Sequence, residues 1–249
     1  MPSYQLYSSR NFPPLSDTLT LLAGLGYQDV EGFGGLYADD AKLAELATGL
    51  KTTRLKMPTA HFGIDMLEKD PDRVLAIART LGIKRIYCPH LMPDQRPTDG
   101  AGWRAFGARL EAAGRPYKAA GLGFGWHTPD FEFVPTADGA IPQAEIMAGG
   151  PSLEWEIDVA WVIRGGADPV QWIRRYGPRI TAAHVKDIAP QGQNTDEDGW
   201  ADVGHGTVDW ASMMAALRAV GCQHFVMEHD NPSDHARFAK RSILALRMN

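Results

Sequence analysis

The sequence predicts one parallel (β/α)8 barrel that spans residues 1–249 as a single domain, and three observations carry this prediction. Short extended runs alternate with longer helical runs along the chain, a pattern typical of parallel strands joined by crossover helices. The chain offers eight such strands, and eight units in about 250 residues favour a closed barrel. No glycine-rich phosphate-binding loop follows the first strand, which argues against an open, nucleotide-binding sheet.

Each expected strand is a short, mostly apolar run bounded by polar residues, glycine or proline, as strands in α/β proteins usually are. Helical runs separate most of these strands, so consecutive strands are expected to lie parallel and side by side. In chain order the expected strands are Tyr4–Tyr7, Gln28–Glu31, Thr53–Met57, Lys84–Cys88, Leu122–Trp126, Glu154–Ile157, Ile180–Ala183 and Gln223–Met227.

The expected helices show apolar residues three or four positions apart. Leu15–Leu25 has this spacing and stops at Gly26, whereas the helix that begins at Asp70-Pro71 and runs to Leu81 carries proline where it is tolerated best. In Gly102–Ala120 the aromatic residues and Leu110 share one face, which predicts core packing by Trp103, Phe106 and Tyr117. The other expected helices are Ala38–Gly49, Pro169–Tyr176, Val208–Ala219 and Asp234–Leu246.

Bulk composition points to a protein that acts on a small molecule. The net charge is -5, from 25 basic and 30 acidic residues, and no basic stripe suggests a nucleic-acid or anionic-membrane partner. The first residues lack the pattern of a signal peptide, and no apolar stretch approaches the roughly 18 residues of a membrane span. Cys88 and Cys222 form no CxxC pair, which fits a reducing compartment. We therefore expect a cytoplasmic protein; barrels of this size often form homodimers.

Active sites of (β/α)8 barrels lie at the carboxyl ends of the strands. Apolar runs end directly on Asp158, His184 and Glu228, so these three side chains are expected on one rim. The loops at Gly32–Tyr37 and Pro89–Asp99, and the polar Asp187–Asp202, are expected to shape the pocket. In all, seven of the eight strand ends carry a histidine or a carboxylate: Glu31, His61, His90, His127, Asp158, His184 and Glu228.

Two histidine nitrogens and two carboxylate oxygens on one rim suit a divalent ion such as Mn, Zn, Co or Fe. The absence of cysteine among them argues against a structural zinc site. Such an ion could polarise a sugar carbonyl while a carboxylate moves the proton. Structural interpretations stay open: His61, His90 and Glu31 could serve as hydrogen-bonded or ion-paired residues, and the other carboxylates could pair with lysines or arginines. His205, His229 and His235 are expected in loops.

Several segments resemble the sugar phosphate isomerase/epimerase group, the xylose isomerase-like TIM barrels that are related to endonuclease IV. Each segment is weak alone, but their order and spacing over nearly the whole chain are specific for the superfamily rather than for one reaction. The segments are Leu6–Arg10, Gly26–Glu31, His127–Phe133, Glu156–Trp161, Gly166–Pro169, His184–Asp187, Val203–Gly206 and Val226–Asp230.

The resemblance implies a divalent metal, Mg included, at the ends of strands five to eight. Asp158, His184 and Glu228 fall on the metal-ligand positions of the family. The fifth-strand position is usually glutamate and is His127 here, in a run where Thr128 and Pro129 depart from the His-Asn-His-Asp-Phe-Glu-Phe variant. Glu228 is then the one metal-bound glutamate, and the second acid/base would come from Lys186, Glu31, His61 or Glu132. Substrate contacts are expected from His61, His90, Glu132 and Trp161.

The leading functional interpretation is a metal-dependent isomerase or epimerase that removes a proton next to the carbonyl of a keto- or aldo-sugar. Glu228 would act as the base and Lys186 would hold substrate oxygens. The alternative is a lyase or dehydratase that acts on a 3-keto sugar, a keto-glycoside or an inosose at the same site. Cleavage of abasic DNA ranks lower because the chain is acidic, and a sugar-binding barrel without catalysis ranks lower because the ligand set is intact.

Overall fold

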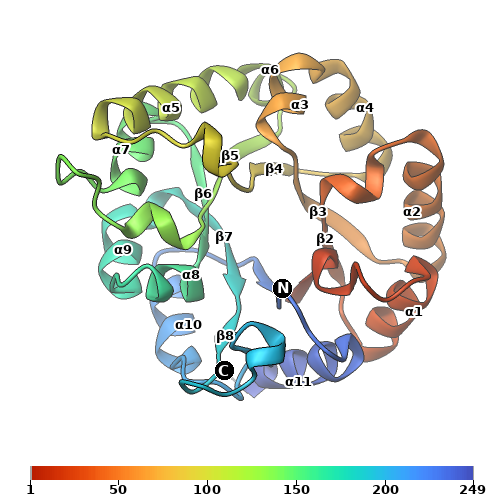
Figure 1. Cartoon of the computed structure of the whole chain (residues 1–249). Coiled ribbons are helices and arrows are strands. Elements are labelled where there is room, and N and C mark those ends of the chain that lie inside the picture. The colour runs from red at the N-terminus through yellow and green to blue at the C-terminus, as the bar shows by residue number, and fades with distance from the viewer. Residues whose placement is uncertain (1, 249) are drawn as a thin grey trace.

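The computed structural model describes residues 2–248 and confirms the closed, all-parallel barrel. Figure 1 looks along the barrel, with the strands in the centre and the helices in a surrounding ring. Each of the eight barrel strands pairs with two parallel neighbours. Around the barrel the order is β1 (Pro2–Gln5), β10 (Phe225–Met227), β7 (Ile180–Val185), β6 (Glu154–Asp158), β5 (Gly123–His127), β4 (Arg85–Cys88), β3 (Lys56–His61) and β2 (Asp29–Gly32).

Aspartates start many of the outer helices. Asp39, Asp99, Asp168 and Asp209 each accept a hydrogen bond from a backbone N–H of the first turn, the usual function of an N-cap residue. Within residues 2–248, no helix has the length and apolar character that crossing a membrane requires. The helices are α1 (Leu15–Leu25), α2 (Asp40–Thr53), α3 (Ile64–Lys69), α4 (Pro71–Leu81), α5 (Gly100–Ala113), α6 (Arg115–Ala119), α7 (Pro142–Gly149), α8 (Val159–Arg164), α9 (Pro169–Tyr176), α10 (Trp210–Ala219) and α11 (His235–Met248).

Some predicted boundaries are wrong. The first strand ends at Gln5, and Leu6–Ser9 forms a short 3-10 helix, η1, instead. The third strand was expected at Thr53–Met57, but α2 continues to Thr53, so β3 occupies Lys56–His61. The single helix expected at Gly102–Ala120 is divided into α5 and α6, because Pro116 cannot donate the backbone hydrogen bond that a continuous helix needs.

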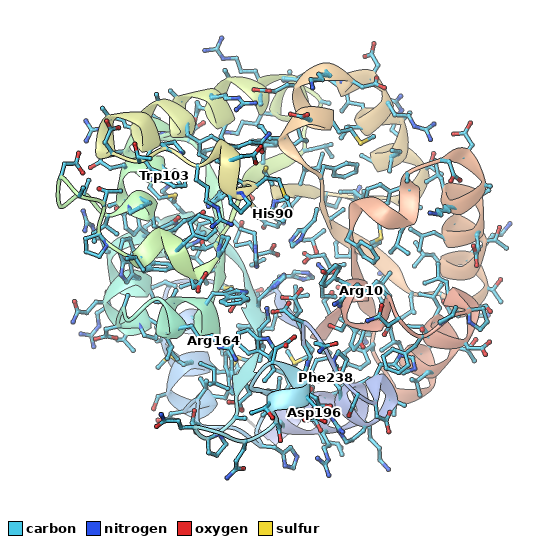
Figure 2. The ribbon with its side chains drawn as sticks, in the orientation of Figure 1. Arg10, His90, Trp103, Arg164, Asp196 and Phe238 are labelled. Atoms are coloured by element: carbon cyan, nitrogen blue, oxygen red, sulfur yellow. The ribbon has the colours of Figure 1, made fainter. Side chains whose placement is uncertain are left out.

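Other elements were not predicted. The helices α3, α7 and α8 lie in segments without an assignment, and the expected polar loop at Asp187–Asp202 contains a small antiparallel hairpin of β8 (Asp187–Ile188) and β9 (Trp200–Ala201). The predicted core face of α5 and α6 is confirmed, since Trp103, Phe106 and Tyr117 are buried. Figure 2 accordingly shows Trp103 in the outer layer and His90 near the centre of the ring.

Candidate active site

The four predicted metal ligands lie together at the carboxyl rim of the barrel. His127 and Asp158 are the last residues of β5 and β6, His184 is the next to last residue of β7, and Glu228 directly follows β10. All four are buried, and one donor atom from each lies within 4.8 Å of the others. We call His127, Asp158, His184 and Glu228 the rim cluster. The structure therefore brings this predicted set into one place.

Lys186 forms ion pairs with both carboxylates of the rim cluster and with Asp230. Its Nζ atom lies 2.8 Å from Glu228 Oε2, 3.2 Å from Asp158 Oδ2 and 3.0 Å from Asp230 Oδ2. Burial alone would raise the pKa of Glu228, but the charges of Lys186 and His184 outweigh burial and hold this pKa well below its ordinary value. The same three carboxylates raise the pKa of Lys186, although burial opposes them. Lys186, Asp158 and Glu228 are thus charged in the buried site, whereas burial raises the pKa of Asp230 to about 6, which leaves Asp230 charged at neutral pH.

His127 presents an unprotonated ring nitrogen, Nε2, that could bind a metal ion. Its Nδ1 atom lies 3.1 Å from the carbonyl oxygen of Pro89, which can only accept, so Nδ1 carries the proton and Nε2 does not. Burial, aided by the charge of His184, lowers the pKa of His127 to about 4. Among the described residues, neither His127 Nε2 nor Asp158 Oδ2 has a hydrogen-bond partner, although both are buried and Asp158 Oδ2 lies 3.2 Å from Lys186 Nζ. These two atoms lie 3.8 Å apart, which fits a divalent ion that both would bind.

A second group of side chains lies beside the rim cluster and shares His184 with it. We call Glu31, His61, Glu156 and His184 the inner cluster; one donor atom from each again lies within 4.8 Å of the others. His61 Nε2 is 2.6 Å from Glu156 Oε2 and 3.2 Å from Glu31 Oε1. The two nitrogens of His184 therefore face different partners: Nδ1 is 2.8 Å from Glu228 and Nε2 is 2.8 Å from Glu31.

Within the inner cluster the two glutamates differ in ionisation. Burial and the nearby charge of Glu31 raise the pKa of Glu156 to about 8. Burial would do the same to Glu31, but His61 and His184 outweigh it and hold the pKa of Glu31 well below its ordinary value. His61 has a pKa near 9, because the two carboxylates outweigh the effect of burial. Glu31 is thus an anion between two histidines, and Gln5 Nε2 donates a further hydrogen bond of 2.8 Å to it.

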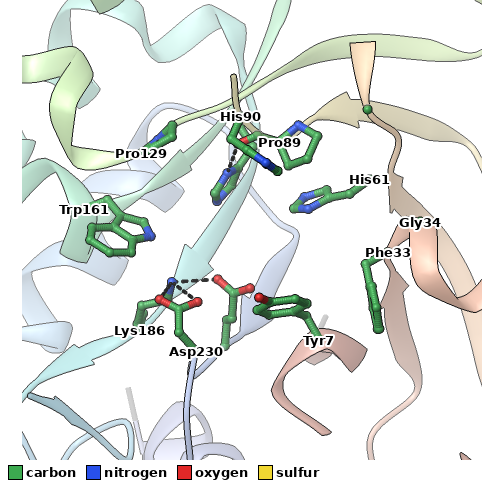
Figure 3. A pocket seen from close by; sticks show the side chains of 13 residues that line it. Tyr7, Phe33, Gly34, His61, Pro89, His90, Pro129, Trp161, Lys186 and Asp230 are labelled. Atoms are coloured by element: carbon green, nitrogen blue, oxygen red, sulfur yellow. Dashed lines mark hydrogen bonds and ion pairs between the residues drawn. The ribbon is translucent and has the colours of Figure 1, made fainter. Parts of the chain in front are cut away.

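A cavity of about 400 Å³ opens above the rim cluster, a volume within the usual range of small-molecule sites. Figure 3 shows Trp161 on one side of the cavity, Tyr7 and Phe33 on the other, and His90 at the top. Two of the three expected pocket loops contribute Phe33, Gly34, Pro89 and His90, whereas no residue of Asp187–Asp202 is in the lining. The complete lining is Tyr7, Phe33, Gly34, His61, Gly63, Pro89, His90, His127, Pro129, Trp161, Lys186, Glu228 and Asp230.

The predicted substrate-binding residues are only partly at the cavity. His61, His90 and Trp161 line it, so their contact with substrate stays a structurally reasonable prediction. Glu132 does not line it: its fully buried carboxylate accepts a hydrogen bond of 2.8 Å from Trp126 Nε1, behind the barrel wall. Glu31 is likewise absent from the lining. This geometry gives Glu132 and Glu31 no direct contact with a ligand in the cavity.

Two important acidic residues were missed. Glu156 lies two positions before Asp158 on β6, and the alternation of side chains along a strand places both on the same face. That spacing could have identified it. Asp230 lies two positions after Glu228 and anchors Lys186, but it follows the strand in an irregular segment where side-chain direction cannot be inferred from sequence. His235, expected in a loop, is instead the first residue of α11.

The closed parallel barrel and the cluster of possible metal ligands at its carboxyl rim define the class of protein to which this chain is similar. The chain belongs to the family of xylose isomerase-like TIM barrels, whose sequence pattern matches residues 19–247. No curated protein matches the chain in sequence.

Solved structures agree with this assignment. A sugar phosphate isomerase/epimerase from Parabacteroides distasonis is 19% identical with a TM-score of 0.81, covering 98% of this chain and 92% of that one. A probable 3-DHS dehydratase from Bacillus anthracis is 15% identical with a TM-score of 0.73, covering 98% of both chains. The IolI protein, solved with a bound zinc atom, is 18% identical with a TM-score of 0.72, covering 99% of this chain and 95% of that one. At these identities the likeness shows the shared fold alone.

Proposed function

We propose that this protein is a divalent-metal-dependent isomerase or epimerase that removes a proton next to the carbonyl of a keto- or aldo-sugar. The observation that carries the proposal is the rim cluster, which opens onto a cavity lined by Glu228, Lys186 and an aromatic wall. Membership of the xylose isomerase-like family supports it, as does the likeness to a protein described as a sugar phosphate isomerase/epimerase.

His127, Asp158, His184 and Glu228 would hold the metal, since each offers one nitrogen or oxygen donor at the same place. When bound, a divalent ion would supply a Lewis acid that stabilises the negative charge of an enediolate. The mixed nitrogen and oxygen donors are compatible with Mn, Zn, Co, Fe or Mg, and the zinc atom described for IolI supports a metal at this kind of site.

Glu228 would be the base. Its carboxylate lines the cavity and is paired with Lys186 at 2.8 Å, which keeps one oxygen engaged while the residue faces the substrate. Lys186 itself lines the cavity and would hold a substrate oxygen. Because His127 stands where the family usually has a glutamate, a proton on the other face of the substrate needs another group. His61 suits this role, since it lines the cavity across from Lys186 and contacts Glu156 and Glu31 behind it.

A lyase or dehydratase on a 3-keto sugar, a keto-glycoside or an inosose is the second candidate. The specific observation in its favour is that Glu228 is the one glutamate of the rim cluster, so the site lacks the matched pair of ligand glutamates that would serve both faces of a substrate. Elimination after proton removal needs one base and one proton donor. The likeness to a probable 3-DHS dehydratase supports the same candidate.

The two candidates are separated by incubating the metal-loaded protein with a panel of keto- and aldo-sugars in deuterium oxide and following proton NMR. Deuterium uptake beside the carbonyl with an unchanged molecular formula means isomerisation or epimerisation, whereas loss of water or of an aglycone means elimination. Glu228→Gln should abolish either reaction. Glu68→Gln removes a carboxylate that pairs with Arg109 on the surface and should leave the rate unchanged.

Metal dependence is tested on the same assay. EDTA should abolish turnover and Mn or Co should restore it, because the four donor atoms of the rim cluster lie within 4.8 Å of one another and would hold the ion that the reaction needs. Full turnover by metal-free protein would contradict the proposed function. The cytoplasmic location, the homodimer and the absence of a nucleic-acid partner stay predictions from the sequence.

A further inference from the structure

The cavity lining holds two cationic side chains, His61 and Lys186, and both are already paired with carboxylates: His61 Nε2 lies 2.6 Å from Glu156 Oε2 and 3.2 Å from Glu31 Oε1. Among its thirteen lining residues, Lys186 is the only lysine or arginine. Its ammonium group is fully buried and lies within 3.2 Å of oxygens from Asp158, Glu228 and Asp230. One cation thus serves three carboxylates. With a divalent ion bound, the charges of the ion and of Lys186 would together only balance those of Asp158, Glu228 and Asp230, so an incoming phosphate or carboxylate group would meet no net positive charge from these groups.

The two arginines nearest in sequence to the lining residues, Arg10 and Arg164, contact aromatic rings and backbone carbonyls. Arg10 stacks on Tyr7, with 3.9 Å from its guanidinium carbon to the ring centre, and donates to the backbone carbonyls of Tyr7 and Asp230. Arg164 lies 3.1 Å from the ring centre of Trp200 and donates to the carbonyl of Asp198. Neither lines the cavity. The side chains that usually bind phosphate in pairs are therefore missing from the described lining.

The walls of the cavity suit the ring of a neutral sugar. Trp161 faces the opposite side, where Tyr7 and Phe33 pack edge to face with ring centres 5.3 Å apart (Figure 3). Aromatic faces pack against the C–H faces of a sugar ring, while its hydroxyl groups can reach the polar side chains of His90 and Asp230. These walls suit a molecule that has apolar faces and many hydroxyl groups.

From this geometry we infer that the site selects uncharged sugars, that is, free keto- or aldo-sugars or keto-glycosides, and excludes phosphate esters and sugar acids. The inference rests on the proposed function, because it names the substrate class of the same site. Asp230 is the residue that determines this specificity. It lines the cavity, a quarter of its side chain is exposed, and it both occupies Lys186 and presents negative charge to the ligand.

The test is a binding comparison on the zinc-loaded protein. A panel of neutral ketoses, aldoses and keto-glycosides is screened by saturation-transfer NMR, and the strongest binder is compared by calorimetry with its own phosphate ester and its own sugar acid. Inorganic phosphate serves as a further probe. The neutral sugar should bind at least about tenfold more tightly than either charged form, since like charges in contact are strongly disfavoured. Equal or tighter binding of a charged form overturns the inference, and so does a panel without any neutral binder.

The ratio of the affinity for the neutral sugar to the affinity for its phosphate ester should fall at least about fivefold in Asp230→Asn. The reason is that this substitution removes the negative charge that faces the ligand. Asp198→Asn is the matched control: Asp198 is exposed, does not line the cavity and has a left-handed backbone that asparagine also tolerates. An equal effect of both variants overturns the role of Asp230. A neutral sugar that binds without deuterium exchange contradicts the proposed function but leaves the selectivity for uncharged sugars standing.

Discussion

The imidazole of His184 has a partner on each nitrogen, and the partner that faces away from the rim cluster is Glu31. A metal-binding histidine usually donates its other N–H to a carboxylate, which fixes the ring and increases its basicity. Glu31 accepts from His184 Nε2 at 2.8 Å and from Gln5 Nε2 at 2.8 Å, and it is fully buried. Its position therefore suits orientation of a ligand better than direct contact with a substrate.

Glu31→Gln should weaken zinc binding about 10- to 100-fold, the usual cost of losing a carboxylate behind a metal-bound histidine. Glu156→Gln is the matched control, because Glu156 is equally buried and contacts His61, but its Oε2 is 3.5 Å from His184 Nε2. Calorimetric titration with zinc measures both affinities, and thermal unfolding measures the stability that each variant loses. Equal losses of zinc affinity in the two variants would show that Glu31 acts only through packing.

The segment that joins β7 to α10 is held against α11 by two carboxylates, Glu197 and Asp202, which both pair with Arg237. Glu197, in the 3-10 helix Thr195–Glu197, accepts hydrogen bonds from Ser233 and from Arg237 Nη2 at 2.7 Å. Trp200 in the same segment packs edge to face on Trp161, with ring centres 4.7 Å apart. The segment thereby supports an aromatic wall of the cavity, so loosening it should affect both stability and binding.

Protonation of Glu197 at low pH should weaken its contacts with Ser233 and Arg237. Burial alone would raise the pKa of Glu197, but hydrogen bonds from Ser233 and Arg237 outweigh it and lower this pKa to about 2. The ordinary value is about 4.3, so the stabilisation is complete above about pH 4.3 and disappears as the pH falls toward 2. Glu197→Gln should therefore lower the melting temperature most at neutral pH, and the difference from wild type should shrink below about pH 4. A difference that is constant from pH 7 to 3 would contradict this account.

Elements differed in how well sequence could predict them. Helices with clear spacing and a stop signal, such as Leu15–Leu25, were predicted at their observed bounds. The helix α8 was missed because it starts directly after Asp158, where β6 ends, and its six residues leave no room for a periodic pattern. Glu156 lies inside β6 rather than at its end, but its side chain points the same way as that of Asp158, two positions later. Contacts between strands that are far apart in sequence, such as that of His61 with Glu156, could be predicted only with the three-dimensional arrangement of the closed barrel in hand.

At the scale of the whole molecule, the order of strands around the barrel explains why the rim cluster could be predicted. The ligands come from β5, β6, β7 and the end of β10, which are four successive neighbours in the barrel. Any parallel barrel with this chain order brings these strand ends together. The charge balance of the cavity could not be predicted in this way, because Asp230 lies in an irregular segment beyond the strand.

The same topology predicts that a bound metal stabilises the entire barrel. An ion held by the rim cluster would connect four neighbouring strands across about 100 residues of chain, and the unfolded chain holds no such site. Zinc at about 100 times its Kd should raise the free energy of unfolding by about 2.7 kcal/mol, which corresponds to about 5 to 10 °C in Tm for a chain of this size. Differential scanning calorimetry with zinc and after EDTA measures the shift. Asp158→Asn should abolish it and Asp198→Asn should retain it; a shift that survives in Asp158→Asn would place the metal elsewhere.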